Sequence, residues 1–191
     1  MKKITPAGPE KIVYQGKLFE VVEQPMNVDS KIKNFEYARR APGTRIIIIK
    51  DNKILITKEH RHEHKDYDYR LPGGKVFDSL KEYNLAVSNK TDLIKSATIA
   101  AKKECYEEVG IIVNNLDLFK VTKAGATIKW DLYYFVTSDF KESAKGQNLD
   151  EGEVIKPHWF TFDKVKQLCI HGKMKEYRSV GVLLSFLDKN I

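Results

Sequence analysis

Three glutamates stand close together in the segment KKECYEEVG, residues 102–110. They are Glu104, Glu107 and Glu108, and their spacing places them on one face if the segment is helical. Like charges at this spacing repel one another. Hard divalent cations prefer oxygen ligands, and Mg²⁺ is usually held by a few carboxylates together with substrate phosphates. The crowded face therefore indicates a cation site that serves a phosphate-containing substrate.

The alternative interpretation is an ordinary solvated helix face whose charge is partly neutralised by neighbouring lysines. Three observations favour the cation site. The glutamates fall in the last turns of the predicted helix, where negative charge opposes the helix dipole. Cys105 and Val109 give the same turns an apolar side, so the charged strip has a fixed direction. Upstream, the turn Pro72-Gly73-Gly74 can bring backbone carbonyls close to the strip.

The pattern around this segment predicts a mixed α/β domain. Short β-rich runs dominate the first third of the chain, and a hairpin is expected around Asp51-Asn52. Ser79 and Glu82 have the spacing of a helix capping box, and Thr91 or Asp92 can cap a second helix. Further strands are expected within 111–122, 129–137 and 153–160, and helices within 162–172 and 176–187.

Composition limits the class of protein. The chain has 191 residues and a formal net charge of +7, which suits an anionic partner such as a nucleotide, a polyphosphate or RNA without selecting one. Cys105 and Cys169 lack CxxC spacing, which disfavours a zinc knuckle and is typical of a reduced, cytoplasmic protein. Neither a secretory signal nor an apolar run of roughly 20 residues, as a membrane helix needs, is expected.

The stretch from residue 74 to residue 111 resembles the Nudix box, G-x5-E-x7-R-E-U-x-E-E-x-G-U, where U is an aliphatic residue. The matching residues are Gly74, Glu104, Glu107, Glu108, Gly110 and Ile111. The resemblance implies an α/β/α sandwich that hydrolyses nucleoside diphosphates linked to another group. It also implies that Mg²⁺, or Mn²⁺ in its place, is held by Glu104, Glu108 and the Gly73 carbonyl, with Glu107 completing the cluster.

Two departures from the box pattern set this chain apart. Lys103 stands at the position of the box arginine, and Lys95 stands at that of the first box glutamate. In the family these two residues form a supporting salt bridge, so another support is expected here. Glu82 and Asp92 are the candidates for the missing carboxylate.

The box also contains an insertion of roughly 15 residues between Gly74 and Lys103. We place it at about 79–92, where the extra capped helix is predicted. Its expected role is to hold the Gly-Gly turn against the glutamate helix, so that the Gly73 carbonyl reaches the metal. A specificity lid over the pocket is the alternative.

Outside the box, the chain is loosely similar to the ADP-ribose pyrophosphatase branch from about residue 12 onward. That branch implies an N-terminal β extension, here 1–40, that contributes to a homodimer, followed by a hydrolase domain over 41–191. It also implies phosphate contacts by Arg39 or Arg40 and by Arg61, because a planar guanidinium matches phosphate oxygens. Exposed positions at a strand end are the alternative for Arg39 and Arg40.

Members of this branch often place a catalytic or metal-binding glutamate in the loop before the last strand. Glu151 and Glu153 are therefore candidates for the catalytic base, with Asp150 third and Glu107 as a candidate from the helix; a plain acidic loop is the alternative. Another departure is Arg70, because many members have Glu before the Leu-Pro turn.

Three alternating histidines, His60, His62 and His64, would share one face of a strand. Closed zinc sites usually have four well-spaced ligands, and no second cluster completes such a set here. We therefore interpret this segment as a polar loop near the substrate entrance.

The sequence thus predicts a Mg²⁺-dependent enzyme that cleaves ADP-ribose or a nucleotide sugar into a nucleoside monophosphate and a sugar phosphate. A hydrolase of another nucleotide, such as a dinucleoside polyphosphate or an RNA 5′ end, remains open. A nucleotide-binding regulator without catalysis is the alternative from another class, although such a module would not need the repelling glutamates. Neither a membrane nor a separate nucleic acid is expected as a partner.

Overall fold

The computed structural model describes residues 4–61 and 65–190. The chain forms two compact units, and each is assembled from three stretches of sequence. Unit 1 consists of Met1–Pro42, Phe77–Thr91 and Lys123–Asp131, and unit 2 consists of Gly43–Val76, Asp92–Thr122 and Leu132–Ile191.

Unit 1 is built on a five-stranded sheet in which β1, β3, β4 and β10 lie in that order and β2 pairs with β3. The long hairpin of β3 and β4 is closed at Asp29 and Ser30, which both have positive φ as a tight hairpin turn requires. The strands are β1 (Thr5–Pro6), β2 (Lys11–Gln15), β3 (Phe19–Val28), β4 (Lys31–Arg40) and β10 (Ile128–Lys129).

The inserted segment forms α1 (Leu80–Ser88) and belongs to unit 1. Its predicted capping box is confirmed, because the Ser79 hydroxyl accepts a hydrogen bond from the Glu82 N–H at 3.2 Å. The Glu82 carboxylate in turn accepts one from the Asp78 N–H at 3.3 Å. Asn84 on this helix donates to Glu20 of β3, which ties the insertion to the N-terminal sheet.

Unit 2 is built on a six-stranded sheet in which β13, β6, β5, β11 and β9 lie in that order and β7 pairs with β6. The predicted hairpin between β5 and β6 is confirmed, with positive φ at Asp51 and Asn52. The strands are β5 (Gly43–Lys50), β6 (Lys53–Arg61), β7 (Asp66–Arg70), β9 (Asp117–Thr122), β11 (Leu132–Thr137) and β13 (Ile155–Thr161), with β8 (Ile111–Val113) and β12 (Phe140–Glu142) forming a separate pair.

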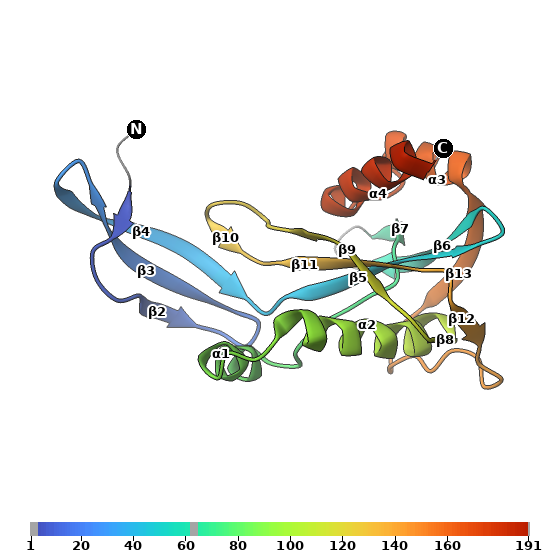
Figure 1. The fold of residues 1–191 in the computed structure, drawn as a ribbon, viewed down its shortest axis with the longest axis horizontal. Helices are drawn as coiled ribbons and strands as arrows, with labels where there is room; N and C mark the ends of the chain where they lie inside the picture. The colour runs from blue at the N-terminus through green and yellow to red at the C-terminus, as the bar shows by residue number, and fades with distance from the viewer. Residues whose placement is uncertain (1–3, 62–64, 191) are drawn as a thin grey trace. The chain divides into compact units, whose positions relative to one another are not determined.

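Helices cover both faces of the unit 2 sheet, as expected for an α/β/α sandwich (Figure 1). On one face, α2 (Leu93–Val109) packs its small buried residues, including Ala101 and Cys105, against Ile46 and Ile48 of β5. On the other face lie α3 (Phe162–Ile170) and α4 (Tyr177–Asn190). No helix in the described part of the chain is long and apolar enough to cross a membrane.

Candidate active site

The three glutamates sit on the second half of α2, a helix whose two ends are defined by local signals. Asp92 caps the start by accepting hydrogen bonds from the N–H groups of Ile94 and Lys95, at 2.9 and 3.1 Å. The helix ends at Gly110, which has a left-handed φ of 66°. Because Cys105 is fully buried between the sheet and the helix, the glutamate strip has a fixed direction, as the sequence predicts.

Glu108 is the most buried of the three, with a relative exposure of 8%. Its Oε2 accepts a hydrogen bond from the Gly73 N–H at 2.7 Å, so the helix and the Gly-Gly turn meet at this carboxylate. Burial raises the pKa of Glu108 to about 8, and the charges of Glu59 and Glu104 add to the rise, while the Gly73 N–H opposes it.

Glu104 lies directly against the Gly-Gly turn. A Cβ added to Gly74 would come within 2.0 Å of its Oε1, so any side chain at position 74 would displace this carboxylate. Glu104 makes no hydrogen bond or ion pair with another residue that the structure describes. Burial raises its pKa to about 7, and the charge of Glu107 contributes to the rise.

Glu107 is partly buried and forms an ion pair with Lys103 at 3.1 Å. Lys103, which replaces the expected arginine, thus partly neutralises a glutamate of its own helix. Lys95, at the position of the missing box glutamate, is exposed. The two candidates for the missing carboxylate, Glu82 and Asp92, both serve as helix caps.

The Gly-Gly turn is held in place by β5. Thr44 donates its N–H to the Gly74 carbonyl and Ile46 donates to the Pro72 carbonyl, both at 2.9 Å. Gly73 has a φ of 142°, and a Cβ there would lie 2.2 Å from the Thr44 carbonyl oxygen. The turn therefore requires glycine, and both of its described supports, β5 and Glu108, belong to unit 2.

The carboxylates of the site suit Mg²⁺, which needs few protein ligands, rather than a metal ion that is fully surrounded by side chains. Within the described residues, no group of three or more His, Cys, Asp or Glu side chains already surrounds a common point. Mg²⁺ does not need such a cage, because it keeps several waters and is bound through one or two carboxylates and the substrate phosphates. The carboxylates of Glu104 and Glu108, one helical turn apart on α2, would supply that donor set.

A family model described as NUDIX domain matches residues 39–179. The chain belongs to the Nudix family. A solved structure described as an ADP compounds hydrolase is 19% identical, has a TM-score of 0.73, and aligns over 100% of this chain and 94% of its own. That likeness shows the fold. A search of curated protein sequences found no match to this chain. The expected class, a Nudix pyrophosphohydrolase with an α/β/α sandwich fold, is confirmed.

A fourth carboxylate lies near α2, which we call the Nudix helix, and the sequence analysis did not predict it. Glu59 of β6 is buried, accepts a hydrogen bond from the Thr57 hydroxyl at 2.8 Å, and raises the pKa of Glu108. Alternation along the strand was an available signal, because Leu55, which shares its face, packs in the α2 core. The predicted phosphate ligand Arg61 lies on this face too, 3.6 Å from the Glu59 carboxylate.

A buried ion-pair network joins the site to the start of α4. Arg45 of β5 makes a two-pronged contact with Glu176, both distances being 2.7 Å, and Arg70 reaches the same carboxylate at 3.0 Å. Burial alone would raise the pKa of Glu176, but the two arginines lower it to about 2. Arg45 also donates to the carbonyl oxygen of Thr44, the residue that holds Gly74, so the network supports the Gly-Gly turn from behind.

The other two predicted substrate arginines belong to unit 1 and have partners there. Arg39 donates to Glu20 at 2.6 Å and to Glu10 at 2.8 Å, and Arg40 lies over the ring of Trp130 at 4.2 Å. Both arginines lie at the end of β4, as the alternative interpretation holds, and both contact other residues of unit 1. Their role toward substrate stays a prediction.

The predicted catalytic loop lies between β12 and β13 in the chain and contacts the C-terminal part of α2. It is tied to the helix by a hydrogen bond from the Asn148 N–H to the Glu107 carbonyl at 2.9 Å. Glu151 and Glu153 are both exposed, and the charge of Glu153 contributes to the raised pKa of Glu104. Of the histidines, His60 lies on β6, whereas His62 and His64 lie outside the described residues.

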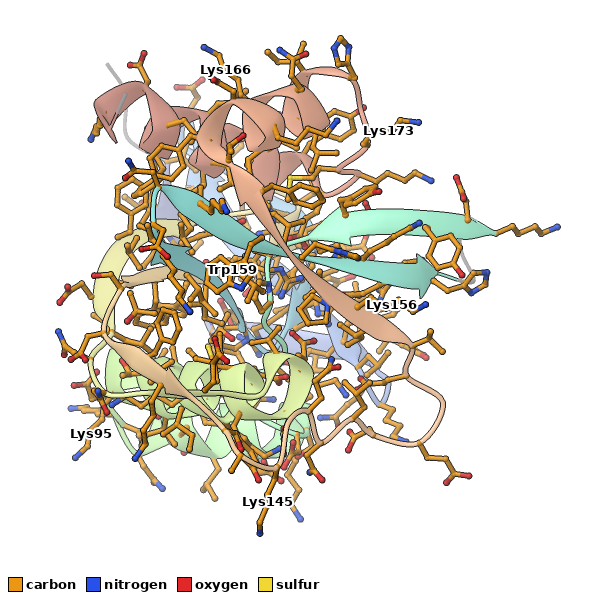
Figure 2. All side chains as sticks on the ribbon, turned by 90° about the vertical axis from the view of Figure 1, so that its right-hand side faces the viewer. Lys95, Lys145, Lys156, Trp159, Lys166 and Lys173 are labelled. Atoms are coloured by element: carbon orange, nitrogen blue, oxygen red, sulfur yellow. The ribbon has the colours of Figure 1, made fainter. Side chains whose placement is uncertain are left out.

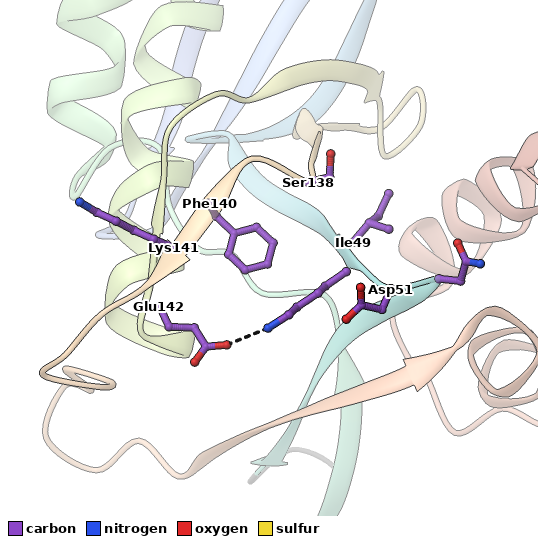
Figure 3. A pocket seen from close by; sticks show the side chains of 8 residues that line it. Ile49, Asp51, Ser138, Phe140, Lys141 and Glu142 are labelled. Carbon is purple, nitrogen blue, oxygen red and sulfur yellow. Dashed lines mark hydrogen bonds and ion pairs between the residues drawn. The ribbon is translucent and has the colours of Figure 1, made fainter.

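An open hollow of about 680 Å³ lies elsewhere in unit 2, at the turn between β5 and β6 (Figure 3). Lys50 and Glu142 face one another across it at 3.2 Å. None of the predicted site residues lines this hollow, so it is separate from the Nudix carboxylates.

Proposed function

We propose that this protein hydrolyses the pyrophosphate of a nucleoside diphosphate linked to another group, with ADP-ribose or a nucleotide sugar as the first choice. The observation that carries the proposal is a pair of carboxylates, the half-buried Glu104 and the buried Glu108, packed on the Gly-Gly turn of a Nudix domain. The similar solved structure is an ADP compounds hydrolase, which supports an adenine nucleotide as the substrate.

Glu104 and Glu108, together with the Gly73 carbonyl and with Glu107 at the rim, would hold Mg²⁺ or Mn²⁺. Such an ion, when bound, neutralises pyrophosphate charge and lowers the pKa of a bound water. The raised pKa values of both carboxylates support this assignment, because burial and, to a smaller extent, repulsion from neighbouring carboxylates disfavour their ionised forms, which a nearby cation would stabilise.

Three glutamates are candidates for the base that removes a proton from the attacking water. We favour Glu153 over Glu151 because the charge of Glu153 contributes to the raised pKa of Glu104. Glu107 is less suited, because it already forms an ion pair with Lys103. The water oxygen attacks one phosphorus, the bridging P–O bond breaks, and the products are a nucleoside monophosphate and a sugar phosphate. Arg61, and Arg39 or Arg40, would contact the substrate phosphates.

A homodimer formed through unit 1 is part of the proposal. Several large apolar side chains of its strands are more than 40% exposed: Ile12, Val13, Tyr14, Phe19, Ile32 and Phe35. An exposed apolar surface of this kind commonly marks a protein–protein interface. Sedimentation of the full chain tests it, and a monomer at micromolar concentration would contradict it.

A turnover screen tests the proposed function. ADP-ribose, nucleotide sugars, dinucleoside polyphosphates, nucleoside triphosphates and a 5′-triphosphorylated RNA are incubated with Mg²⁺, and the products are separated by chromatography. We expect release of a nucleoside monophosphate from ADP-ribose or a nucleotide sugar, and its loss in Glu104→Gln. Turnover confined to another nucleotide would overturn the substrate, and binding without turnover of any substrate would favour a regulator.

A further inference from the structure

The strands β7, β6 and β13 present a sheet face that the Nudix chemistry does not use. In their antiparallel register, Tyr67 lies opposite His60, and Lys58 lies between Tyr69 and Lys156. Alternation along each strand puts these side chains on one face, away from Glu59. We call this surface the basic aromatic face, and it consists of Lys58, His60, Tyr67, Tyr69, Lys156 and His158.

The charge on this face is of one sign. Lys58 and Lys156 lie directly opposite one another on neighbouring strands, an arrangement that destabilises a sheet by like-charge repulsion. None of the six positions carries a carboxylate. Two acids lie on β7, and both contact Lys175: Asp66 is 3.9 Å from its ammonium, and Asp68 accepts a hydrogen bond from its N–H. An anionic partner would relieve the repulsion between the paired lysines.

Two further lysines flank the face at the edge of β7. The Tyr69 N–H donates to the Lys173 carbonyl at 3.3 Å, and the Lys175 N–H donates to the Asp68 carboxylate at 2.9 Å. These bonds fix the backbone of both lysines beside the strand. Figure 2 shows Lys156 and Lys173 on the side of unit 2 along which β7 extends.

The aromatic side chains on this face are held in place and partly open. Tyr67 is 43% exposed, with the Lys58 ammonium 4.3 Å from its ring centroid, and it packs edge-on with His60, the two ring centroids being 5.6 Å apart. Tyr69 packs edge-on against Phe160 at 6.1 Å. Rings fixed in this way can stack on flat ligands with little loss of side-chain freedom.

We propose that the basic aromatic face binds single-stranded nucleic acid. Rings on a sheet that alternate with lysines provide stacking for bases and charge for the phosphates between them, the combination that sequence-tolerant single-strand binding uses. A polyphosphate or an anionic membrane would use the lysines and leave the aromatic rings without a role. The proposal stands apart from the hydrolase function, and it differs from our sequence-based expectation that nucleic acid is not a partner.

The test is the binding of a fluorescein-labelled 12-nucleotide oligouridylate, followed by anisotropy at several salt concentrations. The double variant Lys58→Gln/Lys156→Gln removes the paired charges, and Lys95→Gln/Lys145→Gln makes the same charge change at exposed positions elsewhere in unit 2. We expect the first to weaken binding about tenfold and to lower the salt slope by about 1.4, because each phosphate contact to a single strand contributes about 0.7. The control is expected to change both far less.

The aromatic contribution is tested by Tyr67→Ala and, as a more conservative change, Tyr67→Leu. Loss of one stacked base is expected to weaken binding about tenfold without altering the salt slope. Equal loss in the lysine control would show diffuse charge and overturn the proposal. So would unchanged binding in both Tyr67 variants, or binding of long-chain polyphosphate or anionic phosphatidylserine vesicles as tight as that of the oligonucleotide. Circular dichroism melting confirms that each variant is folded.

Discussion

Lys58 and Glu59 are neighbours in the chain, yet they serve opposite faces of β6. Glu59 lies on the side of α2, buried and bonded to Thr57, where it adds negative charge near Glu108. Lys58 lies on the other side, partly exposed and opposite Lys156. The two-residue repeat of a strand allows one segment to supply an acidic site and a basic surface without their neutralising each other.

The two faces differ in burial as well as in sign. Like charges on the exposed face are screened by water and salt, whereas those around α2 are partly removed from water and interact more strongly. Burial of the carboxylates and, to a smaller extent, this repulsion raise the pKa values of Glu104 and Glu108 to about 7 and about 8. A bound cation should therefore stabilise the carboxylates of Glu59, Glu104 and Glu108, which we call the acidic face, more than a bound anion stabilises the basic aromatic face.

The largest effect is expected from Glu108→Gln, which removes the charge at the centre of the acidic face. Turnover should fall on the order of 100-fold or more, because the carboxylate proposed to hold the metal ion is lost. Above pH 8, where Glu108 is ionised, the melting temperature without metal should rise, because a buried, repelled charge is removed. Glu142→Gln, at an exposed ion pair of unit 2, is the control. Turnover near the wild-type value in Glu108→Gln would contradict the metal assignment.

The pH dependence of stability separates the faces further. Because Glu104 and Glu108 have raised pKa values, the folded state binds more protons than the unfolded state between about pH 4.5 and 8. The free energy of unfolding contributed by these groups is therefore full at low pH and is lost as pH rises through 7 and 8. Denaturant unfolding of the metal-free protein at pH 6 and pH 8 measures it. We expect the double variant Glu104→Gln/Glu108→Gln to flatten the trend, and an unchanged slope would refute the explanation.

Glu176→Ala tests whether burial determines the strength of charge interactions, because Glu176 forms a buried ion pair with Arg45. Glu176 neutralises the buried Arg45 and also Arg70, so its removal should lower the free energy of unfolding by about 3 kcal/mol. Chemical denaturation provides the value. Because the loss comes from stranding Arg45, the double variant Glu176→Ala/Arg45→Met should recover part of it. A loss below that of a surface ion pair would show that the network contributes little.

Ser79→Ala provides a reference for a purely local contact, remote in sequence from either face of β6. The Ser79 hydroxyl caps α1, and loss of such a cap typically costs about 1 kcal/mol. Thermal melting should show this modest change, and Ser79→Asp, which retains a capping oxygen, should restore stability. If Ser79→Ala is neutral, the cap makes no net contribution.

The smallest effect is expected on the basic side. Lys156→Glu converts the like-charge pair with Lys58 into an opposite-charge pair, which should stabilise the sheet by about 0.5 kcal/mol. The change should shrink at high salt, since the pair is exposed. Differential scanning calorimetry at low and high salt measures both. A destabilised Lys156→Glu protein would mean that another contact of Lys156 outweighs the repulsion.

Features encoded within a few residues were predictable from the sequence. The caps at Ser79 and Asp92, the helix end at Gly110 and the hairpin at Asp51-Asn52 each depend on bonds or dihedrals within four or five residues. The apolar side of α2 likewise follows from its own periodicity. These signals were sufficient to place three glutamates on one docked helix face.

Contacts between distant segments were not predictable. Arg45 and Glu176 are 131 positions apart in the sequence, and no local pattern marks them as partners. The ion pairs of Arg39 with Glu10 and Glu20 form only when β3 and β4 pair with the segment that precedes them. Such pairings depend on tertiary packing, which fixes register and burial together.

Gly74 and Glu104 are in direct contact, so the length of chain between these two parts of the Nudix box can vary. The two ends are joined by that contact, by the bond from Gly73 to Glu108 and by the attachment of the turn to β5. The entropy of closing a loop grows only logarithmically, so doubling the intervening length costs about 0.6 kcal/mol. Here the extra chain has become α1 of unit 1. This junction should thus accept a longer graft, such as a small reporter domain in place of residues 85–89, while the two ends stay joined.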